Sequence, residues 1–168
     1  ESAEDIAMYV RNGRLDILAA NPLARQLFSP LFESTEEVPN VARFFFLNPA
    51  APDFFVDWEK IASDTVGVLR AQASKDPYDR QLTDLIGELC TRSEFFSVRW
   101  AAHSVFEHKM GTKRFRHPVY QEVELYFEAL ELPQDPGLSI ISYVAAKGSP
   151  AQNVFQLMKI AEYESRTQ

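Results

Sequence analysis

The sequence predicts an α+β fold in which helices pack on one face of an antiparallel sheet. Two short β-type runs come first, a helical region follows, and about three strands and a last helix complete the chain. The pattern over 121–131 alternates between apolar and largely acidic residues, which is typical of a strand with one covered face. Strands and helices do not alternate along the chain, so a doubly wound parallel sheet is excluded.

The N-terminal region is predicted to be a hairpin followed by a short helix. Asn12-Gly13 separates apolar runs at about 6–11 and 14–20. Asn-Gly between such runs is a strong hairpin signal because both residues tolerate positive φ. Asn21-Pro22 then ends the second strand and begins a helix, since proline suits the first helical position. A solvated loop is expected over 33–39.

The central region is predicted to contain three helices. Apolar residues recur at three- and four-residue steps over 53–73, which indicates one amphipathic helix. A second such pattern covers 82–89, and either Asp76 or Asp79 caps it. Ser93 is expected to cap the third helix, on which large aromatic side chains share a face.

The C-terminal region returns to strands and ends on a helix. The segments 105–110 and 113–117 form either one bent strand or a small hairpin, and another strand is expected over 138–145. Ser149-Pro150-Ala151-Gln152 matches a capping box with proline at the first helical position, so it begins a terminal helix over 150–164. We expect one domain over 1–168, with this helix as an appendage.

Composition narrows the class of protein. Seventeen Lys and Arg against 24 Asp and Glu give a net charge of −7, which argues against direct contact with nucleic acid. The chain has one cysteine, Cys90, so no internal disulfide links it to an oxidising compartment. Neither a transmembrane run nor a signal peptide is visible, and we expect a cytoplasmic protein that does not contact membranes.

The sequence shows no catalytic or metal-binding motif. It lacks a glycine-rich phosphate loop, a nucleophile elbow and a zinc-protease helix. The spacing of His103, His108 and His117 does not fit a zinc site, and Cys90 lies on an apolar helix stripe, as a small core residue would. We therefore expect no enzymatic activity, no metal and no cofactor, apart from a bound fatty acid or other apolar small molecule.

The aromatic residues are the most unusual feature, with 13 Phe, 6 Tyr and 2 Trp. Runs such as Phe44-Phe45-Phe46 and Phe54-Phe55 cannot all point into one core, so some rings must face another surface. That surface is either a seam between helices or a ligand cavity between the helices and the sheet. Arg43, Arg70 and His117 are the candidate polar anchors, although an arginine could instead pair with a glutamate and the histidine could simply hold a turn.

The chain resembles the MmyB-like family of bacterial transcription regulators, and specifically their C-terminal ligand-binding domain. The resemblance runs in order from about residue 5 to 150. It rests on Leu18-Ala19-Ala20-Asn21, Pro39-Asn40-Val41-Ala42-Arg43, Phe46-Leu47-Asn48-Pro49, Asp57-Trp58, Leu69-Arg70-Ala71, Asp79, Leu85-Ile86-Gly87-Glu88-Leu89, Ser93, Phe95, Trp100 and Gly111-Thr112-Lys113 with Phe115 and His117-Pro118.

The resemblance implies a PAS-like fold, with a five-stranded antiparallel sheet and helices packed around a small-molecule pocket. In the family this domain follows a helix-turn-helix domain of the Xre type, which binds DNA, while the PAS-like part senses a hydrophobic small molecule such as a fatty acid or acyl compound. The helix-turn-helix part is absent from these 168 residues. DNA would therefore be a partner only through that domain, and we expect a homodimer.

The candidate ligand-binding residues combine the aromatic clusters, the polar anchors and the family-matching positions. They are Phe45, Trp58, Leu69, Arg70, Leu89, Phe96, Trp100 and His117.

Two positions depart from the family pattern. Pro52 stands where an arginine usually follows the Asn48-Pro49 position, so an arginine anchor there is in doubt. Gln121 stands where a glycine is usual, and we expect a looser turn because glutamine resists the positive φ that glycine permits. The leading hypothesis is a ligand-sensing regulatory domain, and the alternative is a dimerisation module of the same regulator that binds no ligand.

Overall fold

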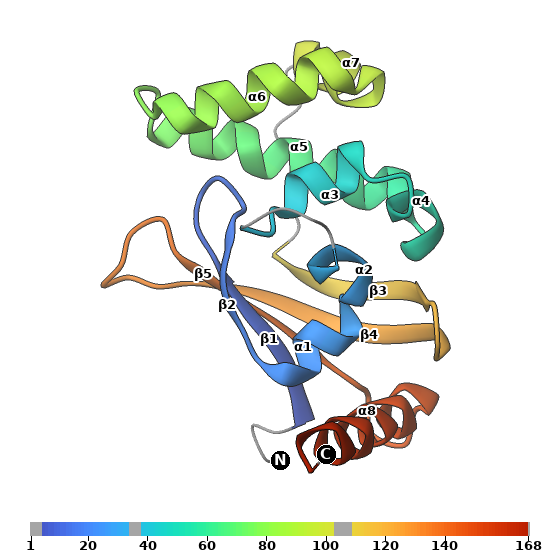
Figure 1. The fold of residues 1–168 in the computed structure, drawn as a ribbon. Coiled ribbons are helices and arrows are strands. Elements are labelled where there is room, and N and C mark those ends of the chain that lie inside the picture. The colour runs from blue at the N-terminus through green and yellow to red at the C-terminus, as the bar shows by residue number, and fades with distance from the viewer. Residues whose placement is uncertain (1–4, 34–37, 103–108, 168) are drawn as a thin grey trace.

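The structure is a computed structural model that describes residues 5–33, 38–102 and 109–167, and it contains a five-stranded antiparallel sheet with helices (Figure 1). The strand order is β2-β1-β5-β4-β3, and this α+β architecture confirms the predicted five-stranded, PAS-like sheet. The strands are β1 Ile6–Arg11, β2 Ile17–Ala20, β3 Met110–His117, β4 Gln121–Glu131 and β5 Ser139–Val144. The helices are α1 Pro22–Leu27, α2 Ser29–Phe32, α3 Val41–Leu47, α4 Ala51–Phe54, α5 Trp58–Lys75, α6 Arg80–Arg92, α7 Glu94–Ala101 and α8 Pro150–Arg166.

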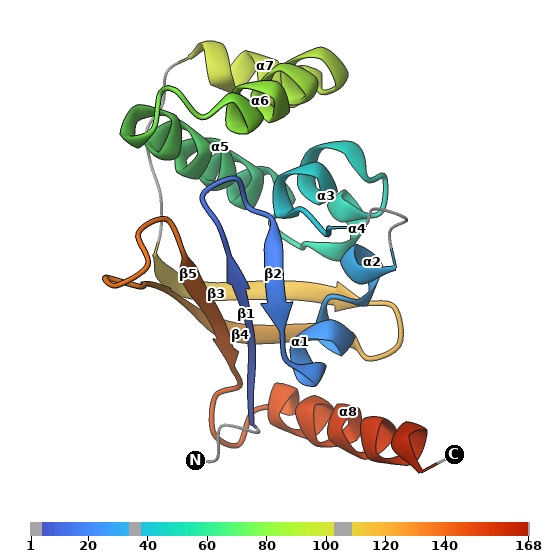
Figure 2. The same cartoon turned by 60° about the vertical axis from the view of Figure 1, so that its left-hand side comes forward.

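Helices α3 to α7 lie together on one side of the sheet, with α6 and α7 outermost (Figures 1 and 2). Helix α8 lies at the opposite end of the molecule, where it contacts α1 and β4. The predicted alternation of β4 is confirmed, because Val123, Leu125 and Phe127 are buried while the residues between them are exposed. The core therefore lies between this inner face of the sheet and α3 to α5.

The N-terminal hairpin forms, but its turn differs from the Asn12-Gly13 turn that the sequence predicts. Leu15 is the residue with positive φ, at 66°, and its N–H donates to the carbonyl of Asn12 at 3.0 Å. The Asn12 side chain also accepts from the N–H of Asp16 at 3.0 Å, which closes a wider loop. Strand β2 consequently begins at Ile17, and the prediction that it begins at residue 14 is wrong.

The single helix predicted over 53–73 is in fact two helices, α4 and α5. Phe55 between them is extended, with φ −98° and ψ 120°, and forms a bridge to Phe115 of β3. The N–H of Val56 donates to the backbone of β3 as well, at 3.1 Å. This break turns both Phe54 and Phe55 into the core. Consecutive aromatic residues can therefore both be buried when the backbone changes conformation between them.

Side-chain caps define the starts of four of the eight described helices. Asp79, rather than Asp76, caps α6, and Ser93 caps α7 as predicted, each by accepting a backbone N–H of the first turn. Helix α3, whose cap is Asn40, was not predicted from the sequence. Helix α8 begins at Pro150 as predicted but without the capping box, because the Ser149 hydroxyl makes no hydrogen bond within the described structure.

Strand β3 runs without interruption from Met110 to His117, so Gly111 lies inside a strand rather than at a hairpin turn. Residues 105–108 of the predicted segment 105–110 lie outside the described part of the chain. In the turn from β3 to β4, Gln121 itself adopts the left-handed conformation, with φ 65°. The expected looser turn is therefore wrong: the glutamine keeps the positive φ and bears the steric strain that a glycine would avoid.

Candidate ligand-binding site

Six of the eight predicted site residues lie on α5, α6 and α7, here called the outer helical layer, and Trp58 is the one at the start of α5. Leu69, Leu89 and Phe96 are completely buried there. The Trp100 ring stacks on the ring of Phe96, with centroids 5.6 Å apart and an interplanar angle of 14°. Arg70 places its guanidinium 3.9 Å from the centre of the Trp100 ring and donates a hydrogen bond to the Trp100 carbonyl. The structure thus brings these residues together as packed helices.

The other predicted residues lie apart from that layer or at its border. Trp58, at the start of α5, packs on Phe95 with ring centroids 4.5 Å apart, and its indole N–H donates to the carbonyl of Phe45 at 3.1 Å. Phe45 faces inward toward the sheet. His117, at the end of β3, lies beside α1 rather than near the tryptophans, because its ring bonds to the backbone of Gln26.

His117 holds a turn through both ring nitrogens. Its Nε2 donates to the carbonyl of Gln26 at 2.8 Å, and its Nδ1 accepts from the N–H groups of Val119 at 3.1 Å and Tyr120 at 3.3 Å. Burial lowers the pKa of the imidazole below its usual value, against the opposing effect of the Gln26 hydrogen bond. The neutral ring therefore connects the β3–β4 turn to α1. His103 and His108 lie outside the described residues.

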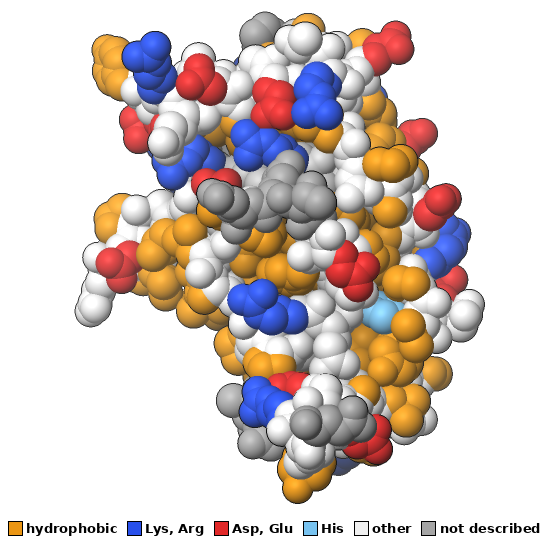
Figure 3. Space-filling view, viewed as in Figure 1, with side chains coloured by type: hydrophobic (Ala, Val, Ile, Leu, Met, Phe, Trp, Pro, Cys, Tyr) orange, Lys and Arg blue, Asp and Glu red, His pale blue; other side chains and the backbone are white. Residues whose placement is uncertain are grey.

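Arg43, the third candidate anchor, is already paired within the helical layer. Its Nε lies 2.9 Å from Glu88 of α6, and Arg92 lies 2.9 Å from the other oxygen of the same carboxylate. Burial acts to raise the pKa of Glu88, but the hydrogen bonds and charges of Arg43 and Arg92 lower it overall. Charged side chains of both signs lie side by side over these helices in the space-filling view (Figure 3).

A cavity of about 40 Å³, here called the inner cavity, lies between the inner face of the sheet and the helices. Rings from both layers line it, including Tyr9, Phe28, Phe45, Phe55 and Tyr143. The ring centroids of the two tyrosines lie 6.3 Å apart, and burial raises the pKa of both phenols. A volume of this size holds only a few waters, so a larger ligand requires either neighbouring space or movement of the walls.

Two cations, Arg11 and Lys113, also line the inner cavity. Each occupies a position on the inner face of its strand: Arg11 is two residues after the buried Tyr9 of β1, and Lys113 is two residues before the buried Phe115 of β3. Such positions are normally apolar because alternate residues of a strand face the core. The ammonium of Lys113 lies 3.9 Å from the centre of the Phe127 ring.

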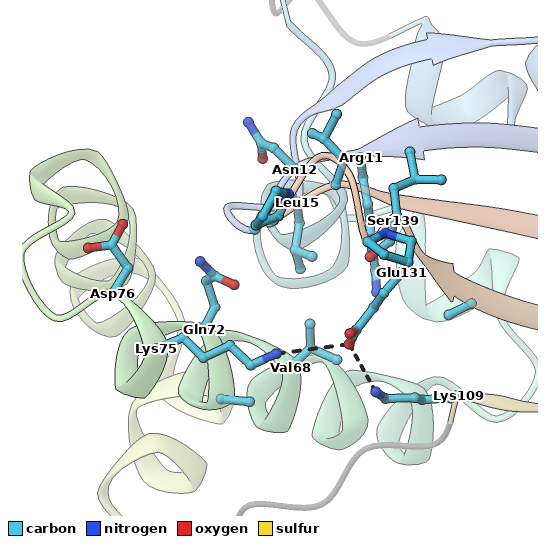
Figure 4. A pocket seen from close by; sticks show the side chains of 18 residues that line it. Arg11, Asn12, Leu15, Val68, Gln72, Lys75, Asp76, Lys109, Glu131 and Ser139 are labelled. Carbon is cyan, nitrogen blue, oxygen red and sulfur yellow. Dashed lines mark hydrogen bonds and ion pairs between the residues drawn. The ribbon is translucent and has the colours of Figure 1, made fainter.

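A larger depression, here called the outer cleft, lies beside the inner cavity and has a volume of about 580 Å³. Figure 4 shows α5 on one side of it, with Val68, Gln72 and Lys75, and the tips of the strand hairpins on the other. Arg11 lines both spaces. Along α5 the lining passes within one turn from Thr65 of the inner cavity to Val68 of the outer cleft, so the two spaces are neighbours.

Arg11 and Lys113 were not among the predicted site residues, although the sequence carries a signal for both. Each extends the row of inward-facing residues of a strand by one position. The predicted strand boundaries contained both residues, but without the pairing of the strands their inward direction was not assigned. The selected anchors were the arginines and the histidine nearest to aromatic runs, and these have partners within the protein.

The five-stranded antiparallel sheet, the helices on one of its faces and the cavity between them define a PAS-like domain. The chain belongs to the family of MmyB-like regulators: the family described as MmyB-like transcription regulator ligand binding domain matches residues 1–158. No curated protein matches the chain. The family confirms the resemblance found in the sequence and assigns the chain to a transcription regulator as its ligand-binding part.

Two further features concern the described part of the chain. None of the helices there has both the length and the hydropathy that crossing a bilayer requires. Within the same residues, no three His, Cys, Asp or Glu side chains gather closely enough to hold a metal ion.

Proposed function

We propose that this chain is the sensory domain of a cytoplasmic transcription regulator and that it binds a hydrophobic small molecule, such as a fatty acid or another acyl compound. Ligand binding would control a helix-turn-helix domain of the same protein, and the chain would catalyse no reaction. The observation that carries the proposal is the aromatic inner cavity beside the outer cleft, within a domain of a ligand-binding family.

The size of the outer cleft and the aromatic lining of the inner cavity support a ligand with a long apolar part. The outer cleft, at about 580 Å³, lies within the range of roughly 300–1,000 Å³ that is usual for small-molecule sites. Each buried CH₂ group contributes about 0.8 kcal/mol, so an acyl chain can reach micromolar affinity with few polar contacts. Control of DNA binding requires in addition that the ligand prefer one of two conformations, and the coupling cannot exceed that difference in affinity.

The proposal is tested by the content of the native protein. We would purify it without denaturation, extract it with organic solvent and analyse the extract by mass spectrometry beside a mock preparation. Ala71→Trp on α5 fills the outer cleft, whereas Ser74→Trp places the same ring on the exposed side of the same helix. We expect a stoichiometric lipid-like species in the wild type and in Ser74→Trp, and its loss in Ala71→Trp. An empty wild-type extract, with no thermal shift from added decanoate, would contradict the proposal.

The control of DNA binding needs a separate measurement on the longer protein that contains this domain. Anisotropy of labelled operator DNA would be recorded with and without the extracted ligand. We expect the affinity for DNA to change with the ligand and to stay constant in the Ala71→Trp variant. If the affinity of the wild type for DNA does not change with the ligand, control of DNA binding is contradicted and only ligand binding remains.

A second candidate function, dimerisation without a ligand, is favoured by one observation on α8. Leu157, Ile160 and Tyr163 follow one another at three-residue steps and are 52%, 56% and 72% exposed, respectively. Light scattering of the wild type and of a Leu157→Glu, Ile160→Glu double variant tests it, with Asn153→Glu on the same helix as the control. A dimer that only the double variant converts to monomer would support an α8 interface, and a monomeric wild type would exclude it.

A further inference from the structure

Arg11 and Lys113 are two cations on the inner face of the sheet that make no close ion pair among the described residues. Within that part of the chain neither makes an ion pair or a hydrogen bond to a carboxylate, whereas Arg14, Arg43 and Arg114 each do. Both side chains are half-buried. Removing a cation from water without a counter-ion is unfavourable. Two such cations therefore lower the stability of the ligand-free protein, and a bound anion would offset this cost.

The surroundings of Lys113 compensate for its burial only in part. Its ammonium lies over the Phe127 ring at 3.9 Å and within 5.8 Å of the Tyr143 ring, and such contacts stabilise a cation by about 0.5–2 kcal/mol. Burial and the neighbouring charge of Arg11 lower the pKa of Lys113 to about 7, while Asp64 of α5 acts in the opposite direction. An added anion would offset both the desolvation of the ammonium and its repulsion by Arg11.

The position of Arg11 indicates how an anion would be oriented. Arg11 lines both the inner cavity and the outer cleft, whereas Lys113 lines only the inner cavity. At the outer rim, the cations Lys75 and Lys109 are both directed to Glu131, at 3.9 and 2.9 Å (Figure 4). The positive charge without a carboxylate partner thus lies at the junction of the two spaces, while aliphatic side chains such as Val68 and Leu138 border the cleft.

We propose that Arg11 and Lys113 bind the carboxylate of an amphipathic ligand whose apolar part lies in the outer cleft against α5. This inference rests on the proposed function and deepens it, because it specifies the ligand's head group and its orientation. The planar guanidinium offers a fork of N–H donors that matches a carboxylate, and the ammonium adds further N–H donors. The inner cavity, with room for a few waters, suits a small head group rather than an acyl chain.

The test compares ligands that share a chain and differ in the head group. Binding of decanoate, 1-decanol and decylamine to the purified protein would be measured by calorimetry and by thermal shift. We expect the wild type to bind decanoate more tightly than 1-decanol by about 10- to 100-fold, the factor that one charge-assisted hydrogen bond provides, and to bind decylamine least. Equal affinity for decanoate and 1-decanol would overturn the anion site but leave the apolar ligand of the proposed function intact, whereas binding of none of the three would contradict both.

Variants locate the site. Arg11→Gln and Lys113→Met should each weaken decanoate by about 10- to 100-fold while leaving 1-decanol within about threefold, and Arg11→Lys should recover part of the loss. Arg80→Gln and Lys60→Met remove the same charges from exposed helix positions and serve as matched controls. If the controls weaken decanoate as much as Arg11→Gln and Lys113→Met do, the effect is one of net charge and the proposal fails.

The pH dependence gives a readout that lost packing would not produce. A bound carboxylate favours the charged ammonium, so decanoate should bind more weakly as pH rises through 7 and Lys113 loses its proton. The other charged groups that face Lys113 are Arg11 of β1 and Asp64 of α5. Burial raises the pKa of the Tyr9 and Tyr143 phenols, so these two groups do not contribute to a slope near pH 7. Lys113→Met should abolish the slope, and a wild type without any slope would remove Lys113 from the site.

Discussion

The outer helical layer and the inner face of the sheet both place cations against aromatic rings, but they use them differently. In the helical layer, Arg70 bonds to the Trp100 carbonyl and stacks on its ring, and Arg99 stacks on Phe95 at 3.4 Å while donating to a serine hydroxyl. On the sheet, Arg11 and Lys113 have no such polar partner among the described residues. A cation beside an aromatic ring therefore indicates a binding function only where its hydrogen-bond donors have no partner among the described residues.

The largest expected effect tests whether the helical layer is packed core. Phe96→Ala should lower the free energy of unfolding by about 3–5 kcal/mol, because this ring is completely buried against Phe46 and Trp100. Urea unfolding measures the loss. Phe95→Ala, on the neighbouring and partly exposed ring, is the matched control and should cost clearly less. Equal losses would mean that the helical layer is not tightly packed. The contrast between a packed helical layer and a binding site on the sheet would then fail.

The next effect has the opposite sign and belongs to the sheet. Lys113→Met should raise the free energy of unfolding by about 1–3 kcal/mol at pH 6, because it replaces a half-buried cation with an apolar side chain of similar shape. Below pH 7 the folded protein carries this charge at a cost. As pH rises from 7 toward 10.5, the folded lysine is neutral while the unfolded one still holds its proton, so the wild type gains stability and the advantage of the variant shrinks.

Unfolding of Lys113→Met and of the wild type at several pH values measures this difference. Lys60→Met, at an exposed position, should leave stability nearly unchanged throughout the range. A destabilised Lys113→Met would show that the contacts of the ammonium with Phe127 and Tyr143 outweigh its burial, and Lys113 would then be a structural residue like Arg70.

Local rules predicted the elements whose cause is local. The alternation over 121–131, the cap at Ser93 and the prolines that begin α1 and α8 each depend on a few neighbouring residues. The break at Phe55 depends instead on a bridge to β3, sixty residues further along the chain, and no local pattern shows it.

The same distinction between local and long-range causes applies to the candidate site. Phe45 was selected from an aromatic run, and it does line the inner cavity. Arg11 and Lys113 are single residues in ordinary strands, and their proximity arises only once β1 and β3 are placed in one sheet. Nothing in the structure tests whether the eight selected residues bind a ligand, so those assignments stay predictions.

The assignment of Arg70 as a ligand-binding residue can be tested directly. If its contacts with Trp100 define its role, Arg70→Met should lower the free energy of unfolding by about 1–2 kcal/mol, through the lost hydrogen bond and ring contact. Decanoate affinity should then stay within about threefold of the wild type. An Arg70→Met protein that unfolds like the wild type but no longer binds decanoate would restore Arg70 as the anchor and move the ligand into the helical layer.

The smallest effect separates strain from function within the sheet. Gln121→Gly should raise the free energy of unfolding by about 0.5–1 kcal/mol, because glycine adopts the left-handed conformation of this turn without steric cost, although it loses more chain entropy. Gln121 is exposed and lines neither the inner cavity nor the outer cleft, so decanoate affinity should not change. Lys113→Met and Gln121→Gly would then both stabilise the sheet, and only the first would lose the ligand. If both keep the ligand, the burial of Lys113 is strain of the same kind as that of Gln121, without a function in binding.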